Sequence, residues 1–533
     1  MRETVDVLIA GAGPVGLLLA TELAREGVDV LLIDQRAERS FFCKALGVTA
    51  RTLEIFEDIG IVDEAIDNGL WFSGITVFAD GKQAQAMDLP DGAMPYGALS
   101  LAQFETERLL EAALGRHGGR VEYGWALTGF AEGAGGVRAS IANAAGETRA
   151  VRSRFLAGCD GAHSTVRRAL GLAFEGGQYP QTFVLADLEV RWDLPRGRMY
   201  RFLRGDGAQP LAAVPVHGSP RRYRLSTIMK KEAEAADGDG TESAVPPGLA
   251  EIAAIMTPLL PAGTELASLH WSSLYRVSHR IVPRYGEGRV FLAGDAAHIH
   301  PPVGGQGMNT GLQDAHNLAW KLALAARGRA RPGLLESYSA ERRPVGQDVV
   351  AQTSRALDEV MARKIRMPGM RESQLLIGYR GSAIVRDDRA KPGEDAPAAG
   401  DRAPDAGGLR RAFVAHPLRL HERLGRGRHV LVGFIGENGE GMEAFSEMAA
   451  IVSGAFGAAA CWFAVAAAGA ALPAQEKVPV LTDDAGAFRA AYGAEAGTAW
   501  LVRPDLHIGW CGTAARQLAE FVRGIVVSPD AAP

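Results

Sequence analysis

The sequence predicts an α/β protein of several domains that begins with a β-α-β unit. Residues 5–10 form a short apolar run that ends in glycine, as a buried strand does where it meets a turn. Apolar residues then recur at helical spacing, and a second apolar run occupies residues 28–33. Residues 182–191 and 221–229 alternate between apolar and polar side chains, which is typical of antiparallel strands with one covered face. We therefore expect a Rossmann-like domain with an antiparallel sheet inserted into it.

Length and composition indicate a globular chain. Its 533 residues correspond to about three domains at roughly 100–200 residues each. The formal net charge of −5 argues against a nucleic-acid partner, because such proteins usually carry a basic surplus. The sequence contains no run of 18 apolar residues and no signal-peptide pattern. We expect a cytoplasmic protein that does not contact a membrane.

The cysteines and histidines do not predict a metal site. Cys43, Cys159, Cys461 and Cys511 are far apart in sequence and form no C-x-x-C pair, which favours four reduced thiols. His298 and His300 form an H-x-H pair, but no carboxylate pattern beside them completes a set of ligands.

A glycine-rich segment follows the first predicted strand. It allows a tight turn and a close approach of backbone to a pyrophosphate, and the next helix directs free N–H groups at the phosphates. Asp34 lies at the end of the second predicted strand, where a carboxylate can bind ribose hydroxyls. The pattern predicts a dinucleotide site, for either FAD or NAD(P), that comprises Gly11, Gly13, Pro14, Val15, Gly16, Asp34, Gln35 and Arg36.

A second glycine-rich segment lies past the midpoint of the chain. Residues 289–294 are an apolar strand that ends before Asp295, whose carboxylate can accept hydrogen bonds from a ribityl chain. The glycines allow backbone N–H groups to approach a flat ring, and the helix start stabilises negative charge on that ring, as a reduced flavin requires. This segment contains Gly294, Asp295, Pro302, Gly304, Gly305, Gln306, Gly307, Met308 and Asn309. A third motif, Asp160-Gly161, predicts only a turn when taken by itself.

In this order the three motifs resemble those of the group A flavoprotein monooxygenases, the family of para-hydroxybenzoate hydroxylase and phenol hydroxylase. The resemblance covers nearly the whole chain. It implies that the first segment binds the FAD pyrophosphate and that Asp160 and Gly161 serve FAD and the nicotinamide. It also implies that Gly294 and Asp295 hold the ribityl chain and that Pro302 and Gly304 to Asn309 line the flavin ring. Gln103, with Glu107 on the same helix face, and Arg51 match family positions that lie near the cofactor.

Lys44 departs from the family pattern. Relatives usually carry arginine in this segment, and lysine keeps the charge but loses the planar guanidinium group. Our hypothesis is that Lys44 still assists the nicotinamide cofactor or a mobile flavin.

The patterning and the resemblance together predict the domain boundaries. The C-terminal domain is similar to the thioredoxin-like domain of the polyketide hydroxylase branch and lacks redox cysteines. The predicted ranges are 1–72, 98–176 and 280–385 for the FAD-binding domain, 73–97 and 177–279 for the substrate domain, 386–405 for a linker and 406–533 for the C-terminal domain.

The family resemblance also implies the reaction. NADH or NADPH reduces FAD, O₂ adds to give a C4a-hydroperoxide, and the oxygen is transferred to a small aromatic substrate that is phenolic or polyketide-derived. The sequence contains one complete dinucleotide fingerprint, so we expect the nicotinamide to bind transiently on the FAD domain of a monomer or homodimer. We assign no catalytic base. The candidates for the substrate pocket are Tyr200, Phe202, His217, Trp271 and Pro301.

Three functions other than ring hydroxylation are alternatives for this chain. A flavin-dependent halogenase would carry a Trp-x-Trp-x-Ile-Pro signature, which is absent from this sequence. A Baeyer–Villiger or other ring-modifying enzyme on the same fold stays open, because the same flavin chemistry serves it. A non-catalytic FAD-binding protein is disfavoured by the complete flavin-lining segment between residues 301 and 311.

Overall fold

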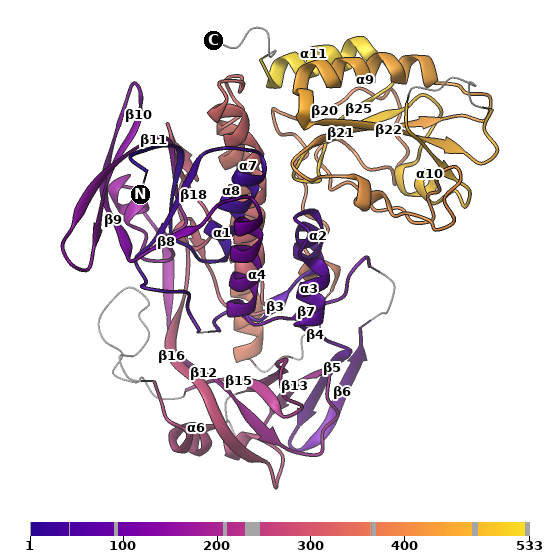
Figure 1. Cartoon of the computed structure of the whole chain (residues 1–533). Helices are drawn as coiled ribbons and strands as arrows, with labels where there is room; N and C mark the ends of the chain where they lie inside the picture. The colour runs from indigo at the N-terminus through magenta and orange to yellow at the C-terminus, as the bar shows by residue number, and fades with distance from the viewer. Residues whose placement is uncertain are drawn as a thin grey trace.

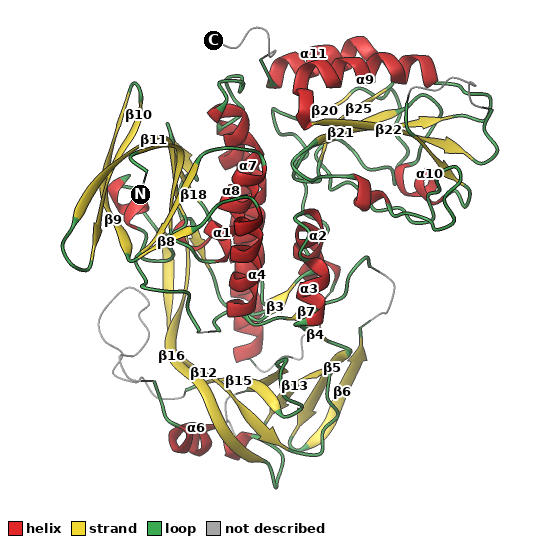
Figure 2. Cartoon of the chain, in the orientation of Figure 1, coloured by secondary structure: helices red, strands yellow, loops and turns green. Residues whose placement is uncertain are grey.

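Three main sheets organise the computed structural model, which describes residues 2–41, 43–89, 94–205, 210–229, 246–362, 364, 369–471 and 478–527 (Figure 1, Figure 2). The predicted α/β class is confirmed. Helices surround the first sheet, the second sheet lies below it in the view of Figure 1, and the third sheet forms a C-terminal unit beside the first.

The first sheet carries the predicted β-α-β unit. Its path is β17 (Gly286–Glu287), β18 (Val290–Leu292), β11 (Thr148–Gly158), β1 (Thr4–Ala10), β2 (Val30–Asp34) and β8 (Val121–Tyr123), and β10 (Gly136–Asn143) and β9 (Trp125–Gly133) extend from β11. The strands β18, β11, β1, β2 and β8 pair in parallel. Because parallel strands end at one edge, the motifs that follow them are brought together there.

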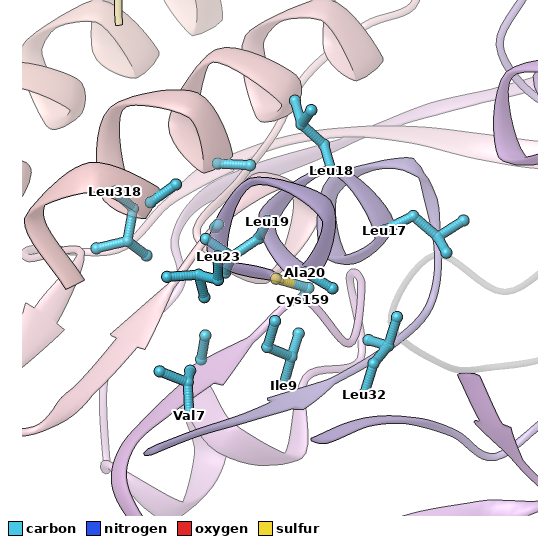
Figure 3. Close-up of a cluster of buried hydrophobic side chains, with 14 of the residues drawn as sticks. Val7, Ile9, Leu17, Leu18, Leu19, Ala20, Leu23, Leu32, Cys159 and Leu318 are labelled. Carbon is cyan, nitrogen blue, oxygen red and sulfur yellow. The ribbon is translucent and has the colours of Figure 1, made fainter. Parts of the chain in front are cut away.

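The helix α1 (Pro14–Arg25) packs almost entirely inside the first unit, between the sheet and α7 (Gly307–Ala326). Its apolar side chains meet Val7, Ile9 and Leu32 of the strands and Leu318 of α7 (Figure 3). The other helices of this unit are α2 (Ala50–Asp58), α3 (Val62–Asp67), α4 (Gln103–Arg116), α5 (Thr165–Ala169) and α8 (Glu336–Met361), together with the short turns η2 (Gly294–Ala296) and η3 (Met370–Ser373).

The second sheet has the alternation that the sequence predicts. Its order is β19 (His298–Ile299), β16 (Glu265–Ile281), β12 (Glu175–Arg191), β15 (Arg222–Ile228), β14 (Leu211–Pro215), β13 (Arg198–Leu203), β5 (Gly74–Ala79) and β6 (Lys82–Asp88). One face packs against α6 (Leu249–Met256), next to η1 (Thr257–Leu259). A small sheet of β3 (Gly47–Val48), β7 (Leu99–Ser100) and β4 (Leu70–Trp71) stands beside it.

The long strands β12 and β16 connect the first two units. Each has 17 residues, and they pair antiparallel from Glu175↔Ile281 to Arg191↔Glu265, with two irregular points. β19, which directly follows the Gly294 turn, pairs with the end of β16. The second sheet is thus joined to the first unit by backbone hydrogen bonds as well as by chain connections.

The third sheet is mixed, with order β20 (Arg386–Asp387), β25 (Ile508–Gly512), β24 (Ala499–Val502), β21 (His429–Ile435), β22 (Ala460–Ala467) and β23 (Val480–Asp483). The strands β21, β22 and β23 are parallel, whereas β24 runs antiparallel to both of its neighbours. Helices α9 (Met442–Phe456) and α11 (Ala515–Ile525) pack on one face, and α10 (Ala487–Tyr492) and η4 (Leu420–Arg423) pack on the other, while η5 (Gly457–Ala459) follows α9.

The segment predicted as a linker, residues 386–405, packs within this third unit. It contributes β20 to the sheet, and Ala399 and Ala403 are buried in the core. Alanine is small enough to pack closely on a sheet without any apolar periodicity, so its pattern resembled that of an extended connection. None of the helices in the described part of the chain is long and apolar enough to cross a membrane.

His429 lies in the core where the third unit meets α7. Its ring stacks on Phe456 at a centroid distance of 3.8 Å, and Trp320 meets its edge at 5.4 Å. Burial lowers the pKa of His429 to about 3. The folded protein therefore keeps this imidazole neutral at pH values where an unfolded chain protonates it.

We expect His429 to weaken the folded state in acid. The stability that the neutral His429 imidazole contributes to the folded state is complete above pH 6.5. It is lost as the pH falls towards 3, since only the unfolded chain gains the proton in this range. Urea unfolding at pH 7, 6, 5 and 4 should show wild type losing about 2–3 kcal/mol more than His429→Leu over this range. His217→Leu, at an exposed position, serves as the control and should follow wild type. Parallel curves for wild type and His429→Leu would contradict the expectation.

Candidate active site

The three sequence motifs meet at one edge of the first sheet. Ala10 pairs with Gly158, and Gly158 pairs with Leu292, so β1, β11 and β18 end side by side. Beyond these residues the backbone N–H of Cys159 donates to Ala10 O (2.8 Å), and that of Ala293 donates to Gly158 O (3.0 Å). The glycine-rich turn, Asp160-Gly161 and Gly294-Asp295 therefore lie beside one another, although more than 280 residues separate the first from the last.

The turn between β1 and α1 requires glycine at two positions for packing. Gly11 has φ +102°, and a Cβ there would lie 2.3 Å from the Cys159 carbonyl oxygen. A Cβ on Gly16 would lie 1.9 Å from the Gly11 carbonyl oxygen. Gly13 differs, because a Cβ there would meet open space at the start of α1, where no side chain caps the helix. This open helix start with Pro14 at its first position can receive a phosphate on free N–H groups.

The two strand-to-helix junctions are in contact. A Cβ on Gly294, which has φ +61°, would lie 2.9 Å from Val15 Cγ2, and one on Gly311 would lie 2.7 Å from the same atom. Val15 belongs to the first turn of α1, and Gly311 to the second turn of α7. The starts of α1 and α7 are thus close enough to serve one ligand, which is the condition on which the flavin hypothesis depends.

Asp34 is joined to the glycine-rich turn. Its Oδ2 accepts a hydrogen bond from Ala12 N (2.8 Å), and its Oδ1 accepts from Arg36 N and Nε (2.8 and 3.0 Å). Arg36 also lies 3.8 Å from Glu107, while the Gln35 side chain is exposed. The carboxylate is thus oriented beside the turn, as the sequence predicts for a group that contacts a ribose.

Two buried carboxyl oxygens at this edge have no hydrogen-bond partner. Glu107 accepts from Gln103 Nε2 on Oε1 (3.0 Å), but its Oε2 has no partner. Asp160 accepts from Thr165 N (2.7 Å) and Val166 N (3.2 Å) on Oδ2, but its Oδ1 has none. Burial raises the pKa of both carboxyl groups. Such oxygens can accept hydrogen bonds from a ligand, and Gly161 beside them has open space at its Cβ position.

Asp295 and Lys44 face the same region. The Asp295 side chain is exposed to solvent, yet desolvation by the surrounding protein raises the pKa of its carboxyl group, and the nearby Lys44 ammonium acts in the opposite direction. The Lys44 side chain is exposed as well. A carboxylate that is accessible to solvent but surrounded by protein can exchange water for the hydroxyl groups of a bound ligand.

The predicted flavin-lining loop faces the segment that contains Gly47. Gly304 and Gly305 have φ +83° and +65°, and a Cβ on Gly305 would lie 3.7 Å from Gly47 Cα. Asn309 links the two segments, since its Nδ2 donates to Gly47 O (2.9 Å) and its Oδ1 accepts from Thr49 N (3.0 Å). Pro302, Gly304 and Gly305 are exposed, Met308 is half-buried, Gln306 is buried, and no side chain caps α7 at Gly307.

Gln103 and Arg224 hold the backbone that precedes Gly47. Gln103 Oε1 accepts from Ala45 N (2.9 Å). Arg224 forms a buried pair with Asp187 (Nε to Oδ1, 2.7 Å) and also donates to the carbonyl oxygens of Cys43 and Lys44. The sequence does not predict this pair, because Asp187 is one polar residue among others in the alternating segment 182–191.

Arg51 does not line the predicted cofactor region. It is buried, and its guanidinium donates to Glu54 Oε2 (2.8 Å) and to the carbonyl oxygen of Asp505 in the C-terminal unit (2.7 Å). Its assignment as a cofactor contact is therefore wrong. The side chain points from α2 to the other unit because the buried Glu54 and the Asp505 carbonyl satisfy its charge there.

Two of the predicted substrate residues, Tyr200 and Phe202, are also misplaced. Tyr200 and Phe202 pack in the core under α6, and the Tyr200 hydroxyl donates to Pro195 O. Their position follows from the two-residue period of β13, which directs both side chains to the face covered by α6. His217 is exposed in a turn after β14.

Trp271 and Pro301 remain candidates for the substrate pocket. Trp271 pairs in register with Asp187, and the Arg224 guanidinium lies 5.6 Å from the centre of its ring, on the sheet face opposite α6. Pro301 is buried, and its carbonyl oxygen lies 3.0 Å from His300 Nδ1.

One buried cluster among the described residues has groups that could ligate a metal. Glu22, Asp58 and His316 bring their ligand atoms within 4.8 Å of one another. Arg25 donates to both carboxylates from between them, and Asp58 accepts at 2.9 Å. The guanidinium thus supplies the positive charge that this cluster needs. His298, from the H-x-H pair, contacts Asp314 (2.8 Å).

Comparison with known proteins gives matches that include all three motifs of the site. A family profile described as "FAD binding domain" matches residues 4–353. The anhydrotetracycline monooxygenase of Streptomyces rimosus is 37% identical over 380 residues, which is 69% of this chain and 72% of that protein. The pentachlorophenol 4-monooxygenase of Sphingobium chlorophenolicum is 32% identical over 425 residues, 75% of each chain. The crystal structure of aklavinone-11 hydroxylase with FAD and aklavinone superposes with a TM-score of 0.79 at 27% identity, covering 98% of this chain and 99% of that one.

Two glycine substitutions should separate folding from ligand binding. Gly13→Ala places a methyl group in open space at the helix start, so the thermal midpoint should stay close to wild type while the affinity for FAD falls about tenfold or more. Gly11→Ala should lower stability by about 1–3 kcal/mol, because φ is +102° and the Cys159 carbonyl is too close. FAD titration followed by flavin fluorescence, together with thermal melts, checks both. Full affinity in Gly13→Ala would exclude this turn as the phosphate site.

Proposed function

This chain belongs to the family described as FAD binding domain, and on that basis we propose that it is an FAD-dependent monooxygenase that consumes NADH or NADPH and hydroxylates an aromatic compound with O₂. The observation that carries the proposal is the contact of Val15 with Gly294 and Gly311, which lets two helix starts serve one ligand. The relatives that match this chain are named as monooxygenases.

The residues at the sheet edge fit FAD. Open space in front of Gly13 and the uncapped start of α1 suit a pyrophosphate. The unpartnered oxygens of Glu107 and Asp160 and the accessible carboxylate of Asp295 suit ligand hydroxyl and amine donors. When bound, FAD supplies hydride acceptance and O₂ activation, which no amino-acid side chain provides.

The chain itself contributes position and charge. The uncapped amides of α7 would lie against the electron-rich edge of the flavin and stabilise negative charge there. Gly304 and Gly305 give the backbone the left-handed conformation that brings it close to a flat ring, and Asn309 holds the facing Gly47 segment. We propose that Pro302, Gly304 to Asn309, Gln103 and Lys44 lie around the ring.

We propose that the substrate binds between the flavin-lining loop and the face of the second sheet that α6 does not cover. Trp271 lies on this face, and Ser273 and Tyr275 follow it at the two-residue spacing of β16. A mixed polar and aromatic wall suits a phenolic ring system. One relative is named for anhydrotetracycline, and one similar structure holds aklavinone, which favours a large polycyclic substrate for this chain.

The remaining assignments are also proposals. The sheets support an FAD-binding domain of residues 1–72, 98–176 and 280–385 with an inserted substrate domain. The mixed third sheet, with helices on both faces, supports a thioredoxin-like C-terminal unit that includes the packed residues from 386 onward. The end of that predicted domain, after residue 527, lies outside the described residues. We further propose a cytoplasmic monomer or homodimer.

Isotope labelling tests the reaction. With ¹⁸O₂, NAD(P)H and a panel of monocyclic and polycyclic phenols, we expect one labelled oxygen in a new ring hydroxyl and the other in water. Substrate should also accelerate NAD(P)H oxidation over the rate without substrate. Label inserted into a C–C bond as an ester would favour the Baeyer–Villiger alternative. Protein that binds FAD but never oxidises NAD(P)H would favour a binding role.

Lys44 provides a test of the reductive half-reaction. Lys44→Met removes the positive charge near Asp295, and we expect anaerobic flavin reduction by NAD(P)H to slow about tenfold. Lys44→Arg should keep most of the rate, because it keeps the charge. Lys82→Met, at an exposed position on β6, is the matched control. Unchanged reduction in Lys44→Met would refute the role proposed for this residue.

A further inference from the structure

A hairpin turn of the C-terminal unit enters the first unit. The turn joins β24 to β25, with Arg503 N donating to His507 O (2.8 Å) and Leu506 in the left-handed conformation (φ +61°). Arg503, Asp505 and His507 are all at least 98% buried. A turn with three ionisable side chains usually lies at a surface, so its burial against α2, α7 and α8 needs a specific set of partners.

The hairpin and its partners form a buried cluster of two positive and two negative side chains. These are Arg503, Lys321, Glu341 and Asp505. Arg503 makes a bidentate pair with Glu341 of α8 (2.7 and 3.0 Å) and also contacts Asp505. Lys321 of α7 donates to Glu341 (2.7 Å), and Asn317 donates to both Glu341 and Asp505 (2.8 and 2.9 Å). Removing any one member would leave an uncompensated buried charge. The cluster therefore fixes the position of the hairpin relative to α7 and α8.

Tyr379 connects the hairpin to Arg342, the neighbour of Glu341 on α8. The Tyr379 ring lies 4.3 Å from the His507 ring and 5.3 Å from the Arg503 guanidinium carbon. Its hydroxyl oxygen accepts a hydrogen bond from Arg342 Nη1 (3.0 Å). The Arg342 guanidinium is thus held from the side of the C-terminal unit.

Arg342 in turn holds the second strand-to-helix junction. Its Nε donates to Asp314 Oδ1 (2.8 Å), and its Nη2 donates to the carbonyl oxygen of Thr310 in the first turn of α7 (3.0 Å). Asp314 Oδ2 accepts from Gly294 N (3.1 Å) and contacts His298 Nε2 (2.8 Å). One guanidinium therefore supports both the Gly294 turn and the helix start that faces the ligand region.

We infer that the C-terminal unit is part of the apparatus that holds FAD: its Arg503–His507 hairpin fixes Arg342 through Tyr379, and Arg342 is a positioning residue for Gly294 and the first turn of α7. The inference rests on the FAD binding proposed above. It gives the C-terminal unit, which lacks paired redox cysteines, a role in retention of the cofactor.

The substitution Tyr379→Phe tests this inference with the loss of one oxygen atom. The ring and its contacts with His507 and Arg503 remain, but Arg342 loses one hydrogen bond. We expect FAD release, followed by the rise of flavin fluorescence after dilution of the FAD-bound protein, to accelerate about three- to tenfold. The thermal midpoint of the FAD-bound form should fall more than that of the apoprotein.

Tyr492→Phe is the matched control. Tyr492 is a buried tyrosine of the C-terminal unit, and its hydroxyl donates to Pro404 O (2.9 Å), not to Arg342. We expect its FAD release rate to stay within about twofold of wild type, although its stability falls by a similar amount. The inference is overturned if Tyr379→Phe releases FAD at the wild-type rate, or if both variants accelerate release equally. Wild-type protein that does not bind FAD would instead overturn the proposed function.

Discussion

The packing of Val15 against Gly294 and Gly311 is the constraint on which the arrangement of the site depends. Because Gly294 and Gly311 have no side chain, the first turn of α1 lies directly against the second strand-to-helix junction. Any larger residue at Gly294 or Gly311 would push α1 and α7 apart and separate their uncapped starts. The parallel register of β1, β11 and β18 brings the three motifs to the same edge, and this contact sets how closely the two helices converge.

The cofactor motifs could be predicted because each one is a short stretch of consecutive residues, in which glycine spacing and the end of a strand can be recognised. The substrate face was harder to predict. Tyr200 and Phe202 are aromatic residues in the correct sheet, but a two-residue period does not say which face a helix will cover, and α6 covers theirs. Trp271 lies on the opposite face, and the same sequence evidence supported all three.

Long-range ion pairs were the main features that the sequence could not reveal. Arg51 matched a family position near the cofactor, yet its guanidinium binds a carbonyl group 454 residues away in the C-terminal unit. Asp314 and Arg342 appear in the sequence as ordinary residues of amphipathic helices, but both are fully buried, and they support the Gly294 turn. The alanine-rich residues 386–405 gave no periodic signal because small side chains pack on a sheet without one.

The paired strands β12 and β16 extend from the first unit into the second sheet, with two irregular points in their pairing. Because this ladder spans both units, a change in the angle between them would require β12 and β16 to bend together, and the two irregular points of their pairing are where such bending is easiest. Substitutions on the face of the second sheet that α6 does not cover should change substrate specificity and leave FAD binding unchanged.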